Sequence, residues 1–437
     1  MKNWFKKVGA VLVTASVLLG STGMTTTYAA DSQDFRGAWI STVYSADYPS
    51  VQNDITKQKA EFSEKLDKLQ AVGINAVVVQ VRPKGDAFYK SELNPWSAVL
   101  TGVQGKDPGY DPMAFMIEEA HKRGMEFHAW LNPYRITTKG TDLSVLSADN
   151  MARQHPDWII TYDGAMYYNP AKTEVKEYIR DTVGEIVENY DVDAIHFDDY
   201  FYPTNYPLSE GESRDGQEAN ARRGHINDMV QMVSKEINSI NSDVEFGISP
   251  IGIWKNNSSD SAGSATNGGE GYYSVFGDAK TWVEKGWIDY IVPQIYWETG
   301  NAYADYETLV KWWSNLVKGT DVTLYIGHGI YKDVVSKEIA KQLKINENYG
   351  VDGSVFFSAR DIFDNRQEVA TSIKQYYSTR VVSEAETEEP IVIEKKKAYA
   401  TKAKITIDGK AVSLEVYTID DYTYFKLRDV ASAVNGT

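Results

Sequence analysis

The sequence predicts an α/β protein whose main domain is a (β/α)8 TIM barrel with enlarged loops. Four junctions along the chain look alike, each running from a helix-like stretch into an apolar, strand-like stretch, which indicates a repeated unit. Apolar strands that alternate with amphipathic helices are typical of a parallel sheet covered on both faces. The junctions are "GINAVVVQV" (73–81), "DVDAIHFDD" (191–199), "GWIDYIVPQI" (286–295) and "GVDGSVFFS" (350–358).

Eight strand candidates follow one another along the chain, which is the number that a closed barrel of this class needs. A doubly wound open sheet is the alternative, but no G-x-G-x-x-G motif follows the first strand. The predicted strands are 36–44, 74–83, 126–133, 193–200, 244–252, 289–297, 321–331 and 351–360.

Helices are predicted between these strands. One over 112–123 begins with Asp111 as its cap and stops at Gly124. Another over 57–72 ends at Gly73. Its apolar face is made by Phe62, Leu66, Leu69 and Val72.

The first thirty residues have the form of a secretory signal peptide. Three lysines precede the apolar stretch 8–20, and small residues ending in "TYAA" (27–30) follow it. The apolar stretch is shorter than the ~20 residues that a membrane span needs, so a cleaved leader is favoured over a membrane anchor. We expect no membrane-spanning segment in the chain after residues 1–30 are removed. The sequence therefore predicts a bacterial protein that is secreted or associated with the cell wall.

Composition limits the partners of the chain. It contains no cysteine, so disulfides are excluded. Removing the three lysines of the leader takes the formal net charge from −16 to −19. Nucleic acid is an unsuitable partner for such a chain, because binding phosphates requires a basic surface. We expect a monomer that uses no cofactor and no metal.

The composition changes behind the last predicted strand. Residues 31–380 form the predicted barrel domain, and 381–401 form a charged linker. Residues 402–437 return to strand-like alternation, and we expect them to be the incomplete start of a small C-terminal domain.

Polar side chains gather at the predicted carboxyl ends of the strands, where barrels build their active sites. Strand alternation places Asp198 in the barrel mouth, with Asp199 just beyond it. Arg82 could contact substrate or form a structural ion pair with Asp198. The polar residues predicted to share the mouth with Asp198 are Gln80, Arg82, Asn132, Gln294 and Tyr296.

Aromatic residues accompany these polar groups. Flat rings beside planar hydrogen-bonding side chains suit sugar rings, although the same rings could be core packing. His128 and His196 are predicted to be core histidines of the barrel rather than metal ligands. The predicted substrate-binding residues are Arg82, Asn132, Tyr134, Trp254, Gln294, Tyr296 and Trp297.

The chain resembles the glycosyl hydrolase-like 10 family over about residues 34–378. The matching motifs are "FRGAWISTVYSADYPS" (35–50), "VVQVRPKGDAFYKSELNPWS" (78–97), "HAWLNPYR" (128–135), "HFDDYFYP" (196–203), "GISPIGIW" (247–254) and "PQIYW" (293–297). The resemblance implies a bacterial envelope glycosidase, with peptidoglycan strands that lack stem peptides as the best candidate substrate. It matches Asp198 and Asp199 to the acidic pair of the family. It matches Arg82, Asn132, Gln294 and Tyr296 to the family's strand-end polar residues.

Residues 407–437 resemble the opening of a copper amine oxidase amino-terminal-like (stalk) domain. Despite the name, the resemblance implies no copper in this chain.

Adjacent aspartates resemble the acids of substrate-assisted glycosidases, in which a 2-acetamido group of the sugar is the nucleophile. One carboxylate orients that amide and the other protonates the leaving oxygen, and we assign Asp198 and Asp199 to these roles respectively. The alternative is an Asp198 nucleophile that works with Glu298, the well-placed second acid at the end of strand six.

Two other classes of function stay open. A non-catalytic barrel could bind cell-wall glycans. A metal-dependent polysaccharide hydrolase or deacetylase could use both aspartates and a histidine as ligands, although the sequence lacks a tight histidine spacing.

Overall fold

The computed structural model describes residues 34–387, 399–407, 410–419 and 422–425. The predicted signal peptide and most of the predicted linker lie outside these residues. The chain divides into two compact units, Met1–Tyr376 and Tyr377–Thr437. Within the described ranges, none of the helices has the length and apolar character needed to span a membrane.

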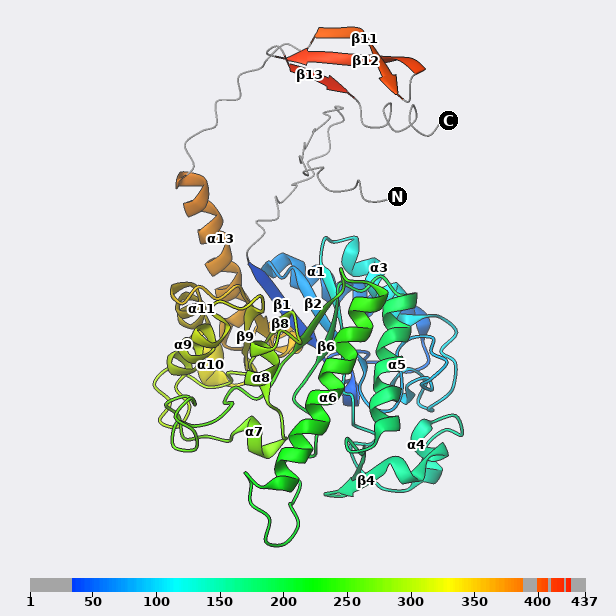
Figure 1. Ribbon diagram of the computed structural model, residues 1–437, viewed down its shortest axis with the longest axis vertical. Helices are drawn as coiled ribbons and strands as arrows, with labels where there is room; N and C mark the ends of the chain where they lie inside the picture. The colour runs from blue at the N-terminus through cyan, green and yellow to red at the C-terminus, as the bar shows by residue number, and fades with distance from the viewer. Residues whose placement is uncertain (1–33, 388–398, 408–409, 420–421, 426–437) are drawn as a thin grey trace, which may run out of the picture. The chain divides into compact units, whose positions relative to one another are not determined.

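The first unit contains a closed barrel of eight parallel strands, which confirms the predicted (β/α)8 fold (Figure 1). The strands are β1 (Phe35–Ile40), β2 (Ala76–Arg82), β3 (Glu126–Leu131), β6 (Ala194–Phe197), β7 (Glu245–Ile248), β8 (Tyr290–Ile291), β9 (Thr323–His328) and β10 (Gly353–Phe356). Each pairs with its neighbours along the chain, and β10 pairs with β1 to close the barrel.

The strands are shorter at their carboxyl ends than the sequence predicts. β6 ends at Phe197 rather than 200, and β8 covers only two residues of the predicted 289–297. Pro293 lacks a backbone N–H and cannot donate to the ladder, which favours an early end for β8. Beyond these ends, alternation no longer sets the direction of a side chain.

Helices surround the barrel, and their ends follow the expected caps. Asp54 accepts a hydrogen bond from the Lys57 N–H, and Gly73 ends the same helix at φ 101°, a conformation that glycine adopts readily. Asp111 caps the helix that begins with Pro112. The helices are α1 (Ile55–Val72), α2 (Ala98–Thr101), α3 (Pro112–His121), α4 (Met151–Gln154), α5 (Thr173–Asn189), α6 (Gln217–Ile240), α7 (Gly271–Ser274), α8 (Ala279–Glu284), α9 (Tyr306–Val317), α10 (Asp333–Lys337), α11 (Ile339–Asn348), α12 (Ala359–Phe363) and α13 (Val369–Thr387).

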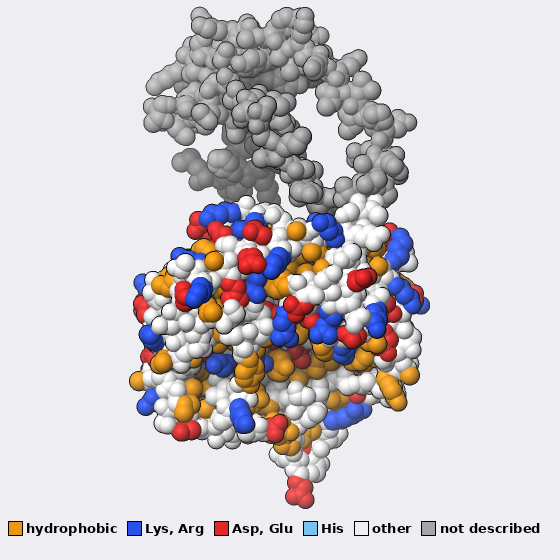
Figure 2. Space-filling view, turned by 180° about the vertical axis from the view of Figure 1, so that it is seen from behind, with side chains coloured by type: hydrophobic (Ala, Val, Ile, Leu, Met, Phe, Trp, Pro, Cys, Tyr) orange, Lys and Arg blue, Asp and Glu red, His pale blue; other side chains and the backbone are white. Residues whose placement is uncertain are grey.

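Enlarged loops extend the carboxyl end of the barrel, at the bottom of Figure 1. They carry α4, α7 and an antiparallel hairpin of β4 (Ile159–Tyr162) and β5 (Ala165–Tyr168). Acidic and basic side chains are interspersed over the face of the barrel that Figure 2 shows.

The barrel interior contains a buried polar cluster, which lies deeper in the barrel than the side chains at its carboxyl end. The Tyr290 hydroxyl lies 2.9 Å from His128 Nδ1 and 3.0 Å from His196 Nδ1. Gly247 makes room for the tyrosine, because a Cβ there would lie 1.9 Å from its ring. Burial lowers the pKa of His196 well below its usual value, so the imidazole is neutral. Both histidines are core residues, as predicted.

The second unit contains a three-stranded antiparallel sheet, in the order β11 (Tyr399–Ile407), β12 (Lys410–Ile419) and β13 (Tyr422–Phe425). The sheet accounts for the strand-like alternation of this part of the sequence.

Candidate active site

The two adjacent aspartates follow the last residue of β6, at the carboxyl end of the barrel. Asp198 is buried, with 3% of its surface exposed, whereas Asp199 is half-buried. The chain turns at once, and the Tyr200 N–H donates to Asp198 Oδ1 over 3.2 Å. The turn leaves two carboxylates side by side with different access to solvent.

A chain of side-chain amides holds Asp198 in place. Asn132, one residue beyond β3, donates from Nδ2 to Asp198 Oδ2. Gln80 of β2 donates in turn to Asn132 Oδ1. The side-chain oxygen of Gln80, Oε1, accepts the backbone N–H groups of Thr42 and Val43 over 3.0 and 2.9 Å. The loops after β1 and β3 therefore share one hydrogen-bond network with Asp198.

Asp199 has a separate donor. Gln294 Nε2 donates to Asp199 Oδ1 over 2.9 Å and to the Ser249 carbonyl over 2.8 Å. Backbone bridges pair Gln294 with Ile251 and Gly327, which fixes this loop against the neighbouring strands. Each aspartate is thus oriented by an amide from a different side of the barrel.

Burial raises the pKa of both aspartates above the usual value. The charge of Asp199 raises the pKa of Asp198 further, to about 7. The Arg135 guanidinium opposes both increases, and it lies 4.2 Å from the centre of the Tyr200 ring. The pair therefore keeps one proton at a pH where an exposed aspartate is ionised, as a general acid requires.

Aromatic rings border the pair. Burial and the charges of both aspartates raise the pKa of Tyr296 well above its usual value, so its hydroxyl stays a hydrogen-bond donor. Its ring stacks 5.9 Å from Phe357 and meets Tyr331 edge-on. Tyr200 and Tyr331 are 44% and 42% exposed, which leaves ring surface open for a sugar.

The prediction that Arg82 shares the mouth with Asp198 is wrong. The pairing of β2 with β3 shifts register between Gln80 and Arg82. The two side chains therefore do not follow the regular alternation of a strand, on which the prediction depended. The guanidinium is buried and donates to Asn94 Oδ1, to the Asn132 carbonyl and to the Tyr178 hydroxyl of α5. Arg82 therefore fixes the loop that carries Asn132 instead of contacting substrate.

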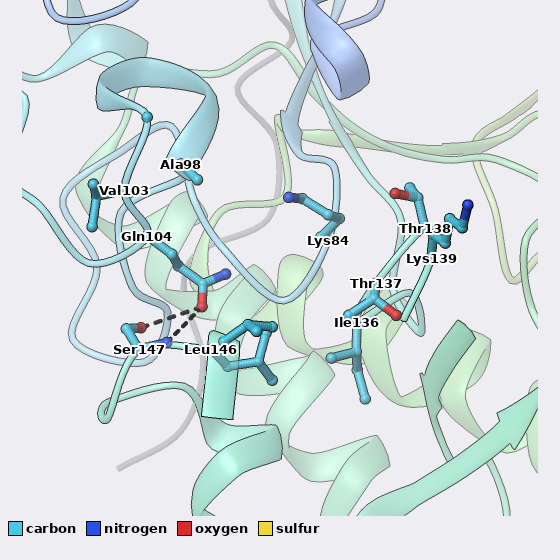
Figure 3. A pocket seen from close by; sticks show the side chains of 12 residues that line it. Lys84, Ala98, Val103, Gln104, Ile136, Thr137, Thr138, Lys139, Leu146 and Ser147 are labelled. Atoms are coloured by element: carbon cyan, nitrogen blue, oxygen red, sulfur yellow. Dashed lines mark hydrogen bonds between the residues drawn. The ribbon is translucent and has the colours of Figure 1, made fainter. Parts of the chain in front are cut away.

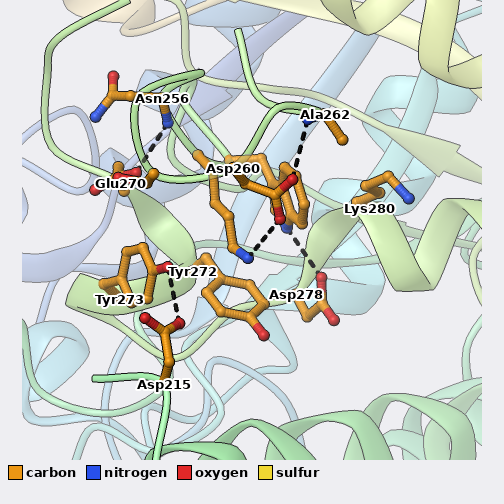
Figure 4. Close-up of polar contacts among 12 residues, drawn as sticks. Asp215, Asn256, Asp260, Ala262, Glu270, Tyr272, Tyr273, Asp278 and Lys280 are labelled. Carbon is orange, nitrogen blue, oxygen red and sulfur yellow. Dashed lines mark hydrogen bonds and ion pairs between the residues drawn. The ribbon is translucent and has the colours of Figure 1, made fainter. Parts of the chain in front are cut away.

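Two predicted aromatic platforms are also buried. Tyr134 has no exposed surface, so its ring faces cannot receive a sugar. Trp254 is 6% exposed, donates its indole N–H to Asp278 over 2.9 Å and stacks on Trp312. It belongs to a polar cluster that orders the long loop after β7, in which Tyr273 donates to Asp215 (Figure 4). Both rings support loops.

The remaining predicted residues lie after β8. Trp297 is half-buried, with its ring 5.6 Å from Lys332 Nζ, and keeps some surface for a ligand. Glu298 is half-buried too, but its carboxylate accepts from the Asn301 side chain of its own loop.

Two residues next to the pair, Arg135 and Tyr200, were absent from the predicted site, as was Tyr331, which contacts Tyr296. Arg135 and Tyr200 lie within the motifs "HAWLNPYR" and "HFDDYFYP". Their place in these motifs was the feature of the sequence that could have assigned them to the site. Among the residues that the structure describes, no group of three or more histidine, aspartate or glutamate side chains is arranged to hold a metal ion.

The sequence is similar to those of known glycosyl hydrolases. The sequence profile of the family described as "Glycosyl hydrolase-like 10" matches residues 34–345. Glycosyl hydrolase YngK of Bacillus subtilis (strain 168) is 42% identical over 397 residues, covering 85% of this chain and 78% of that protein. Glycosyl hydrolase DigH of Escherichia coli (strain K12) is 40% identical over 349 residues, covering 74% and 78%.

Solved structures resemble the chain in fold. Alpha-L-fucosidase isoenzyme 2 from Paenibacillus thiaminolyticus superposes with a TM-score of 0.52 at 14% identity, covering 80% of this chain and 50% of that one. At this identity the likeness concerns the barrel architecture alone.

Proposed function

The chain belongs to the glycosyl hydrolase-like 10 family and is a glycoside hydrolase, and from this premise we propose that it cleaves peptidoglycan strands that lack stem peptides. Two features support this substrate. The predicted signal peptide would deliver the enzyme to the cell envelope, as a secreted or wall-associated protein. The sugars of peptidoglycan carry 2-acetamido groups, which an adjacent pair of aspartates suits.

The observation that carries the mechanism is the different setting of the two aspartates. Asp198 is buried and fixed by Asn132 and the Tyr200 N–H, so it suits a fixed partner for the acetamide N–H. Asp199 is more exposed and can reach the glycosidic oxygen. In this scheme the acetamido oxygen attacks the anomeric carbon while Asp199 protonates the leaving oxygen, and the same carboxylate then activates water.

The proton must change its position when substrate binds. Before binding, the charge of Asp199 favours the protonated form of Asp198. An acetamide N–H donated to Asp198 favours the ionised form of that group, because a hydrogen bond to a carboxylate lowers its pKa. Substrate binding therefore transfers the proton to Asp199, the position from which it is used.

Glu298 is less suited to act as a second acid. Its carboxylate accepts from Asn301 within its own loop, and its charge acts on Lys332. These contacts favour a role in ordering the loop after β8 over the alternative with an Asp198 nucleophile.

Mass analysis of products from purified, peptide-free glycan strands tests the proposed function. We expect shorter strands with intact acetyl groups and no cleavage by an Asp198→Asn, Asp199→Asn double variant. Release of acetate without cleavage would identify a deacetylase, and binding without any product would identify a glycan-binding barrel.

A further inference from the structure

A pocket of about 500 Å³ lies between the loops that follow β2 and β3 (Figure 3). Its volume falls in the range of ~300–1,000 Å³ that is usual for ligand sites. Lys84 and Gln104 follow β2 in the chain, and Ile136 and Thr137 follow β3. We call this cavity the lysine pocket.

The lysine pocket adjoins the aspartate pair through Arg135. Arg135 Nη1 donates to the Pro83 carbonyl over 3.5 Å. Because Pro83 precedes Lys84 and Arg135 precedes Ile136, this contact joins the two loops that line the pocket. The same guanidinium lies on the Tyr200 ring and acts on both aspartates. The lysine pocket and the aspartates therefore share the carboxyl end of the barrel, with Arg135 between the Pro83 carbonyl and the Tyr200 ring.

The lining of the pocket selects for negative charge beside a small apolar group. Its lining includes no acidic residue, in a chain with 61 acidic and 45 basic residues, and Lys84 points into it, whereas the exposed Lys139 points away (Figure 3). The lining also contains aliphatic side chains, among them Val103, Ile136 and Leu146, beside hydroxyl-bearing residues such as Thr137 and Ser147. This combination fits a carboxylate on a short aliphatic branch better than a neutral sugar hydroxyl.

A buried carboxylate fixes the position of Lys84. Its Nζ lies 3.5 Å from Asp86 Oδ2, and Asp86 has no exposed surface. Gln104 Nε2 donates to the same oxygen over 3.3 Å, and Gln104 Oε1 accepts the Ser147 N–H over 3.0 Å. Because the Lys84 ammonium carries three N–H groups, it can bind Asp86 and a ligand carboxylate together.

We propose that the lysine pocket binds the free carboxylate of the lactyl branch that a muramic acid residue carries once its stem peptide has been removed. This inference rests on the proposed function and adds a reason for its specificity. A stem peptide converts the carboxylate into an amide, which removes the charge that Lys84 binds and adds bulk. The pocket thereby makes the absence of a peptide a condition for tight binding.

The test compares two forms of the same peptide-free strands, one with free lactyl carboxylates and one with these groups converted to methylamides. For the wild-type enzyme, we expect amidation to raise KM about tenfold or more while kcat stays close to its original value. This arm needs no protein variant.

The second arm uses Lys84→Met together with Asp86→Asn, which removes the ion pair without leaving a buried charge unpaired. We expect this variant to act on free strands with the KM of the amidated form and to lose its preference between them. The matched control is Lys68→Met with Glu64→Gln, which removes an exposed ion pair on α1 and should leave the preference unchanged.

Equal kcat/KM of the wild type on both forms would overturn the carboxylate assignment while leaving the proposed glycosidase activity intact. A folded double variant that keeps the full preference would overturn it as well. Failure of the wild type to cleave either form would overturn the proposed substrate, and the inference with it.

Discussion

At the scale of single residues, the proposed chemistry depends on how Asp198 and Asp199 share one proton. The two groups differ in burial and in donors, with Asn132 at one and Gln294 at the other. The positive charge of Arg135 lowers the pKa of both aspartates and so opposes the increase that burial causes.

Asp199→Asn should abolish hydrolysis and leave the fold unchanged, because an amide keeps the shape of the carboxylate but cannot deliver a proton. General acids contribute ~10²–10⁴ in rate, so kcat should fall by about that factor. Steady-state kinetics on strands with a poor leaving group measure the loss, and a thermal melt checks the fold. Turnover near that of the wild type would exclude Asp199 as the acid.

Arg135→Met should move the pH–rate profile to higher pH. The guanidinium lowers the pKa of both aspartates, so its removal raises both and the acid form persists to a higher pH. The shift is measured by following the hydrolysis rate over about pH 4–9 for the variant and the wild type. Arg180→Met, which removes a surface pair with Asp181, is the control and should not move the profile.

Sequence reasoning located the chemically distinctive residues but misplaced some of their neighbours. Asn132 meets Asp198, and Gln294 meets Asp199, because each of these residues lies close to the end of a strand. Arg82 does not join them, because the register shift in β2 turns it toward α5. Such a local irregularity has no signature in the residue pattern.

At the scale of elements, the barrel strands position the site through a polar interior as well as through apolar packing. Tyr290 of β8 lies between His128 of β3 and His196 of β6. One hydroxyl therefore connects three strands in the barrel interior, deeper than the aspartates.

Tyr290→Phe should reduce the free energy of unfolding by about 1–3 kcal/mol, because two buried imidazoles lose a partner while the ring volume is kept. Denaturant unfolding measures the change. The control is Tyr325→Phe, since that ring packs in the same core cluster but its hydroxyl does not lie between the histidines. Equal stability of Tyr290→Phe and the wild type would contradict a structural role for the hydroxyl.

Element ends were harder to predict than element types. Apolar character continues beyond β8 into Ile295, yet that residue lies in a loop that bonds to Gly327. Burial in the barrel wall and burial under a long loop leave the same apolar pattern in the sequence.

At the scale of the whole molecule, the repeated helix-to-strand unit was enough to predict the closed barrel, because each unit leaves apolar strands that only a covered parallel sheet can bury. The same repetition could not predict the lysine pocket, which is built by loops whose positions depend on contacts between distant residues such as Arg135 and Pro83.

If the adjacent aspartates assist attack by an acetamido group of the substrate, as proposed, the anomeric configuration of the product must show it. Attack from one face followed by water from the same face must retain the configuration. Proton NMR of the first-formed reducing end should therefore show retention. Inversion would exclude acetamido assistance and favour two separated carboxylates, with Glu298 as the base.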